Sequence, residues 1–185
     1  PRHTWAVEVA PEAVQQLEQS LIRNNLEDKI TPLCADLRCL PPRPPAGSFD
    51  LVSCNPPYFA PGTGFICPNE TRRTARHELD CSITDICTAA ARLLKYGGRF
   101  CLCHRPERLC DVLEAMRASG IEPKRLRFVQ KRPETGPWLF LCEGRRGGRS
   151  FLRIQPPLII QNPQGGFSEE LLSIYGKTTA KEEQP

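Results

Sequence analysis

The stretch Phe49-Asp50-Leu51-Val52-Ser53-Cys54-Asn55-Pro56-Pro57-Tyr58 decides how this sequence is interpreted. Its first six residues form a short, mostly apolar run, which is typical of a strand in a buried parallel sheet. The two prolines that follow prevent the strand from continuing. We therefore expect Asn55 and Tyr58 to lie where a strand meets its loop, the edge at which open α/β sheets bind ligands.

The four residues after this strand suit the binding of a planar amine. The side-chain oxygen of Asn55 and the main-chain oxygen of Pro56 can accept the two hydrogens of an exocyclic amino group. The prolines hold both acceptors in place, and Tyr58 offers a flat ring on which a base can stack. The alternative is a plain turn with a buried tyrosine, because Asn-Pro is a common turn signal.

The order of the predicted elements alternates strand and helix. Gly97-Gly98 is expected to end the helix over residues 79–95. This order predicts an α/β, doubly wound, mostly parallel sheet with a C-terminal antiparallel hairpin. The predicted strands are residues 4–9, 30–35, 49–54, 100–103, 124–131, 138–143 and 151–160, and the predicted helices are 11–25, 79–95, 107–118 and 168–175. Residues 59–76 are expected to be a mobile loop over the site, and residues 178–185 a polar tail.

Several segments resemble one known family. The strand-end motif resembles that of S-adenosylmethionine-dependent methyltransferases acting on amino groups, and other segments resemble its tRNA1(Val) (adenine-37-N6)-methyltransferase subgroup. The resemblance extends to about residue 177, implies a class I methyltransferase fold over residues 1–177, and assigns catalysis to Asn55, Pro56 and Tyr58. The matching segments are residues 4–12, 34–37, 76–78, 95–100, 155–158 and 174–176.

The resemblance also implies residues for the cofactor, S-adenosyl-L-methionine. Glu8 and Asp36 end two strands, where carboxylates can accept hydrogen bonds from the ribose hydroxyls and the adenine amino group. Leu37 would flank that adenine, and Asn55 would also line the cofactor site. The alternatives are an acid near the helix that begins at Pro11 for Glu8, and a cap or turn residue for Asp36.

Substrate contacts are implied for five residues after Asn55. These are Pro57, Phe59, Arg73, Arg76 and His77. The arginines would attract phosphates, and Phe59 would help to hold a flipped base, with loop packing as its alternative. No general base is required, because in-line methyl transfer gains mainly from proximity and alignment. His77 is as consistent with phosphate binding or helix capping as with a base.

Composition limits the possible classes of protein. The chain has 185 residues, which is one domain in size, and 39% hydrophobic residues. It has no apolar run long enough to span a membrane and no visible signal peptide. Ten cysteines include no Cys-x-x-Cys pair, and Cys101-x-Cys103-His104 is the only group resembling metal ligands. We expect buried, reduced thiols in a cytoplasmic protein that binds no metal.

The formal net charge of +4 comes from 25 Lys and Arg residues against 21 Asp and Glu residues. The basic residues gather in three stretches, residues 72–76, 124–132 and 145–153. Such stretches near a strand-end site would attract RNA. For residues 124–132, charges that protect an edge strand are an equally good interpretation.

The family pattern begins with a strand and a glycine-rich turn that this sequence does not contain. Its first expected strand already matches the family's second, and its first glycine is Gly47. We therefore expect a truncated chain in which the strands ending at Glu8 and Cys54 either keep unpaired edges or close on each other. Cofactor binding by the chain alone is then expected to be weak or absent.

The function that the resemblance implies is N6-methylation of an adenine in tRNA. Three alternatives remain open. The first is glutamine-amide methylation of a release factor, which uses the same four-residue motif. The second is N2-methylation of a guanine in ribosomal RNA. The third is a non-catalytic RNA-binding fragment, which would be consistent with the absent glycine-rich turn.

Overall fold

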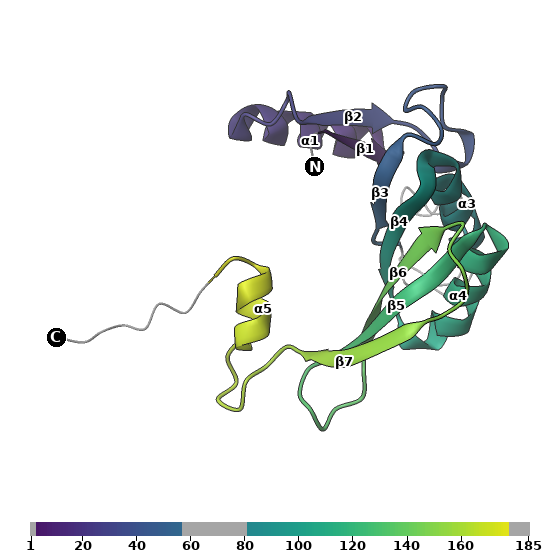
Figure 1. Ribbon diagram of the computed structural model, residues 1–185. Coiled ribbons are helices and arrows are strands. Elements are labelled where there is room, and N and C mark those ends of the chain that lie inside the picture. Colours follow the sequence, from purple (N-terminus) through teal and green to yellow (C-terminus); the bar gives the residue numbers. More distant parts are fainter. Residues whose placement is uncertain (1–2, 57–80, 178–185) are drawn as a thin grey trace, which may run out of the picture.

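A computed structural model describes residues 3–56 and 81–177 of the chain (Figure 1). Its main element is a five-stranded sheet with the strand order β3-β4-β6-β5-β7. Strand β6 is antiparallel to both of its neighbours, while β3 pairs with β4 and β5 pairs with β7 in parallel. The strands are β3 (Phe49–Cys54), β4 (Leu94–His104), β5 (Ile121–Gln130), β6 (Leu139–Arg146) and β7 (Arg153–Ile159). The expected mixed sheet with a C-terminal antiparallel hairpin is confirmed.

A second sheet consists of two parallel strands, β1 (Thr4–Glu8) and β2 (Ile30–Cys34). They are joined by helix α1 (Pro11–Asn24), which has proline in its first turn, where the missing N–H is not needed. Asn25 ends the helix in the left-handed conformation with φ of 53°. The short 3-10 helix η1 (Leu37–Cys39) follows β2. These bounds agree with the predicted strand–helix–strand unit.

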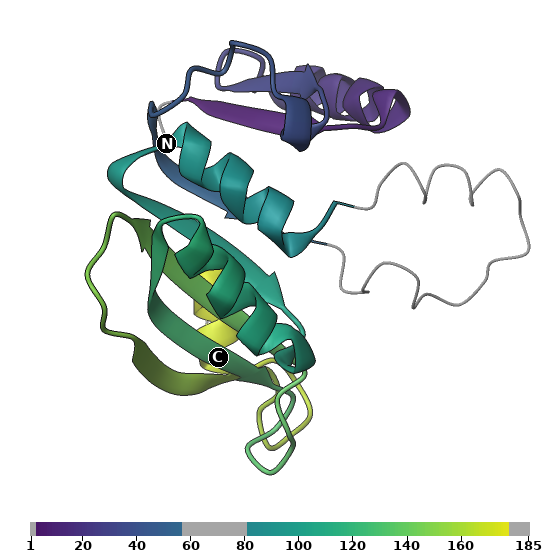
Figure 2. The ribbon, with the colours of Figure 1, turned by 90° about the vertical axis from the view of Figure 1, so that its right-hand side faces the viewer.

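Helices cover the two faces of the five-stranded sheet unequally (Figure 2). Helices α3 (Ile83–Leu93) and α4 (Leu109–Ala118) lie on one face, and α4 follows the 3-10 helix η2 (Pro106–Arg108). The short helix α5 (Glu169–Ile174) lies on the other face, where Leu171 packs against β5, β6 and β7. No helix among the described residues is both long enough and apolar enough to cross a lipid bilayer.

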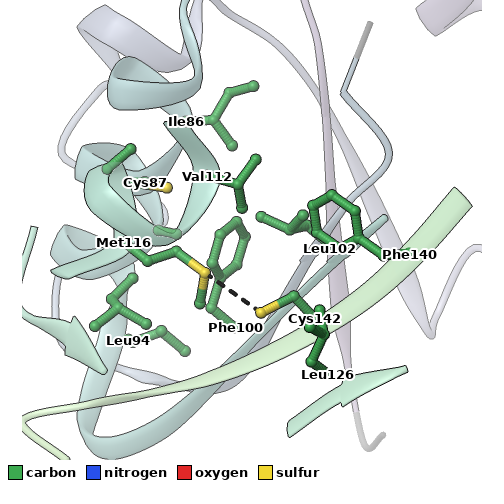
Figure 3. Packing of buried hydrophobic residues seen from close by; sticks show 13 residues of the cluster. Ile86, Cys87, Leu94, Phe100, Leu102, Val112, Met116, Leu126, Phe140 and Cys142 are labelled. Carbon is green, nitrogen blue, oxygen red and sulfur yellow. Dashed lines mark hydrogen bonds between the residues drawn. The ribbon is translucent and has the colours of Figure 1, made fainter. Parts of the chain in front are cut away.

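The main hydrophobic core lies between the sheet and α3 and α4 (Figure 3). Phe100 and Phe140 are fully buried on neighbouring strands, and Met116 reaches them from α4. The thiol of Cys142 donates to the Met116 sulfur over 3.8 Å. Burial of each large apolar side chain contributes about 1.5–3 kcal/mol. This core therefore fixes β3 and β4, whose carboxyl ends carry the site.

The boundary between α3 and β4 differs from the prediction. The helix starts after Ser82, whose side chain forms a capping box with Asp85, and it ends at Leu93. Strand β4 then begins at once, so the predictions of a helix to residue 95 and a strand from residue 100 were wrong. The two glycines lie in a bulge of β4, where Gly97 has φ of 77° and a Cβ on Gly98 would meet the Phe49 carbonyl oxygen at 3.0 Å.

Strands β1 and β3 do not pair with each other in the described part of the chain. β1 pairs with β2, and β3 pairs with β4, so each keeps one edge without a ladder. Of the two arrangements expected for these strands, the structure has the unpaired edges. The two-stranded unit meets the rest of the molecule elsewhere: Leu37 packs on the main core, and the Arg92 guanidinium donates to the Leu40 carbonyl over 3.2 Å.

Candidate active site

Asn55 follows β3 directly, at the carboxyl end of the sheet. The pairing of Cys54 with Leu102 places the next residues of the two strands, Asn55 and Cys103, side by side. The Cys103 thiol donates a hydrogen bond to Oδ1 of Asn55 over 3.0 Å. Asn55 itself is exposed. The predicted amide is therefore at the end of a parallel strand, with its oxygen held from β4.

Pro56 is buried and borders a cavity of about 380 Å³. The cavity lies between the end of β3, the start of α3 and helix α4. It could hold a group the size of a nucleobase, although most of its wall comes from residues that the sequence did not single out. Among the lining residues are Pro56, Ser82, Ile83, His104, Arg108 and Asp111.

His104 is the buried polar residue of this region, with 4% of its surface exposed. Its Nδ1 accepts a hydrogen bond from the Arg105 N–H over 2.8 Å, so the ring proton lies on Nε2. Burial lowers the pKa of His104 below its ordinary value of 6.5; Arg108 lowers it further, and Asp111 opposes the shift. The neutral imidazole therefore presents a fixed tautomer beside the cavity.

Glu8 ends β1, as predicted, and its carboxylate turns toward the start of α1. Oε1 accepts from the N–H groups of Val9 at 2.8 Å and Ala10 at 3.0 Å. This is the alternative arrangement, an acid at a helix N-terminus. In the described residues Oε2 has no hydrogen-bond partner, so one carboxylate oxygen can still accept a ligand hydroxyl.

Asp36 follows β2 and forms a tight local pair. Its carboxylate caps η1 through the Arg38 N–H at 2.8 Å and accepts from the Arg38 guanidinium at 2.5 Å. These hydrogen bonds lower the pKa of Asp36. Asp36 therefore forms the helix cap that was its alternative role. Among the described residues, its carboxylate accepts hydrogen bonds from Arg38 alone.

The structure brings the predicted residues together in two groups. The Ala35 N–H donates to the Glu8 carbonyl over 3.0 Å, which joins the ends of β1 and β2. Asn55 and Pro56 lie in the other sheet, and no described hydrogen bond connects them to Glu8 or Asp36. The remaining predicted site residues lie outside the described residues: Pro57, Tyr58, Phe59, Arg73, Arg76 and His77.

The basic stretch of residues 124–132 mainly holds the sheet together. Arg125 pairs with Glu143, and Arg127 pairs with Glu170 at 2.7 Å and donates to the Pro156 carbonyl at 2.9 Å. Strand β5 lies between β6 and β7, so the interpretation as edge protection was wrong. Because Arg125 and Arg127 already have acidic partners, this stretch supports RNA binding less than its sequence suggested.

The cysteines are free thiols wherever the structure describes them. Burial raises the pKa of Cys54 to about 11 and that of Cys87 and Cys142 to about 12. The expectation of buried thiols was wrong for three others, which lie on outer surfaces: Cys34, Cys39 and Cys110. Within residues 3–56 and 81–177, no group of three or more His, Cys, Asp or Glu residues is placed to hold a metal ion.

Comparison with known proteins agrees with the fold and with the family that the sequence resembles. The chain is 33% identical over 170 residues to a tRNA1(Val) (adenine(37)-N6)-methyltransferase of Tolumonas auensis, covering 91% of this chain and 68% of that protein. The chain belongs to this methyltransferase family. A family member from Bacteroides fragilis strain YCH46 is 26% identical over 132 residues, covering 71% of this chain, and the chain spans 55% of that relative's length. No family model matches the sequence.

Among solved structures, a predicted O-methyltransferase of Agrobacterium tumefaciens aligns with 97% of this chain and 80% of its own, with a TM-score of 0.74 and 18% identity. This likeness confirms the class I methyltransferase fold that the resemblance implied. Sequence reasoning considered Cys103 and His104 only as metal-ligand candidates, whereas the structure places Cys103 against Asn55 and His104 at the wall of the cavity beside Pro56. A usable signal existed: Cys103 ends, and His104 follows, a predicted strand of a mostly parallel sheet.

Proposed function

We propose that this chain carries the catalytic part of an enzyme that methylates N6 of an adenine in tRNA, using S-adenosyl-L-methionine. Residues 1–177 form the proposed methyltransferase domain, and residues 178–185 a tail. The observation that carries the proposal is the position of Asn55 and Pro56 at the carboxyl end of β3, in a chain of this family. We also propose that it acts in the cytoplasm, which its free thiols and a tRNA substrate would support.

The proposed chemistry needs two hydrogen-bond acceptors for the adenine amino group, and it needs that group to be aligned with the methyl donor. Oδ1 of Asn55 and the main-chain oxygen of Pro56 accept the two amino hydrogens of the adenine, which directs the nitrogen lone pair out of the ring plane. Both acceptors follow a strand fixed by the main core, so their positions are set before the substrate binds. Tyr58 stacks on the base, and Pro57, Phe59, Arg73, Arg76 and His77 contact the RNA. The proton that leaves the methylated amine passes to water.

The cofactor would be held by the ends of β1 and β2. Oε2 of Glu8 would accept hydrogen bonds from the ribose hydroxyls, Asp36 would accept from the adenine amino group, and Leu37 would lie against that ring. The residues fit because Glu8 keeps one oxygen without a partner in the described part of the chain, and because its strand end adjoins that of Asp36. When bound, S-adenosyl-L-methionine supplies an electrophilic methyl group.

The test is methyl transfer from labelled S-adenosyl-L-methionine to unmodified tRNA. Both the 185-residue chain and the longest protein its gene encodes should be assayed, followed by digestion of the RNA to nucleosides. N6-methyladenosine supports the proposal. Methylated guanine, labelling of a release factor without labelling of RNA, or RNA binding without any transfer would each contradict it.

A further inference from the structure

We propose that Cys103 is a positioning residue for Asn55, because its thiol holds the amide that accepts the substrate's amino hydrogens. This inference rests on the proposed role of Asn55. The parallel pairing of β3 and β4 sets the two residues side by side, and the thiol donates to Oδ1 over 3.0 Å. Hydrogen bonds in which sulfur takes part are weak, yet this one fixes an orientation.

Orientation matters because the two ends of an amide have opposite character. Rotation of the terminal torsion of asparagine by half a turn exchanges an acceptor oxygen for a donor NH2 group, and this torsion is soft. An NH2 group facing the substrate amine would set donor against donor. A thiol donor at Oδ1 selects one of the two orientations, and an amide oxygen has two lone pairs, so it can accept from both a thiol and an amine.

The side chain of Cys103 is itself held in place by packing against apolar neighbours. It is half-buried and packs against a small cluster formed by Val129, Leu139 and Leu158. Leu171 of α5 packs against the same cluster. Strand β7 and helix α5 therefore help to position the Cys103 thiol, and through it the proposed catalytic amide of Asn55.

The same strand offers a matched control. Cys101 lies two residues earlier, so its side chain projects from the same face of β4. It is also half-buried, but it pairs in register with Glu143 of β6 and with Ser53 of β3. Removal of the Cys101 thiol therefore tests the cost of losing a similar side chain away from Asn55.

The kinetic experiment compares Cys103→Ala, Cys103→Ser and Cys101→Ala in the longest protein the gene encodes. Cys103→Ala should lower kcat for tRNA methylation about three- to tenfold, as expected for one lost hydrogen bond. KM for tRNA and for S-adenosyl-L-methionine should change less than about twofold, because binding is not what the thiol supports. Cys103→Ser, which keeps a donor, should recover most of kcat, and Cys101→Ala should match wild type.

A serine variant no better than alanine, an unchanged kcat in Cys103→Ala, or an equal loss in Cys101→Ala would overturn the inference. A double-mutant cycle on the unfolding equilibrium tests the contact without any assay of activity. Cys103→Ala and Asn55→Ala should be coupled by about two- to tenfold in the unfolding constant. Additive effects would show that the contact does not form, whereas coupling without tRNA methylation would reject the proposed function alone.

Discussion

The two sheets of this molecule carry the two groups of proposed site residues, and they are held in different ways. Asn55 and Pro56 follow a strand of the five-stranded sheet, whose Phe100 and Phe140 are fully buried. Glu8 and Asp36 follow strands of the two-stranded sheet, in which no strand residue is fully buried. The proposed acceptor atoms are thus placed by a packed core, while the carboxylates of Glu8 and Asp36 are placed by local hydrogen bonds near the surface.

This contrast predicts very different costs for truncating a side chain in each sheet. Phe100→Ala should lower the free energy of unfolding by about 3–5 kcal/mol, because it empties space in the main core. Val7→Ala, on half-buried β1, should lower it by about 1 kcal/mol. Urea denaturation followed by circular dichroism measures both values. Similar costs at the two positions would show that the two sheets are equally well packed.

Amide hydrogen exchange should separate the sheets along the backbone. Amides of β4 and β6 should exchange at rates set by global unfolding, because they lie between paired strands over the main core. Amides of β1 and β2 should exchange faster, through local opening. Mass spectrometry of peptic fragments makes the comparison, and equal protection in β1 and β4 would remove the distinction.

A smaller effect should appear in the dependence of stability on pH. The pKa of His104 is lowered in the folded chain by its burial and by Arg108, so the unfolded chain binds the proton more tightly. The free energy of unfolding should therefore be constant above the ordinary value of 6.5 and fall as the pH drops below it. His104→Gln should remove this fall.

The exposed His3 provides the control for that experiment, since His3→Gln should leave the decline below the ordinary histidine value in place. The pKa of Asp36 is also lowered, so Asp36 affects the free energy of unfolding only as the pH falls below the ordinary value of 3.8, well away from the histidine range. A decline that persists in His104→Gln would assign the pH dependence to another group.

Features set by local sequence were predictable here, and features set by contacts between distant residues were not. The apolar run before two prolines was enough to predict β3 and the position of Asn55. The sequence predicts a helix end at Gly97-Gly98, because it does not show that the Phe49 carbonyl lies close enough to require glycine. The contact between Cys103 and Asn55 joins residues 48 positions apart and follows from strand pairing alone.

The hydrogen-bond partners of the Glu8 and Asp36 carboxylates were equally unpredictable from the sequence. Glu8 ends β1 as predicted and Asp36 lies two residues after the end of β2, but the sequence could not say that local N–H groups and Arg38 would bind their carboxylates. Likewise, the basic residues of β5 could be interpreted as an edge or an RNA surface until the pairing with Glu143 and Glu170 was known.

The most direct test of the central claim is the yield of N6-methyladenosine in tRNA treated with Asn55→Ala, measured in the longest protein the gene encodes. Ser53→Ala is the control, because Ser53 is exposed on the same face of β3, one pleat away. The account predicts a loss of at least about 100-fold in kcat for Asn55→Ala, in a variant that is still folded at the assay temperature. Ser53→Ala should keep near wild-type activity. Full activity in Asn55→Ala would contradict it.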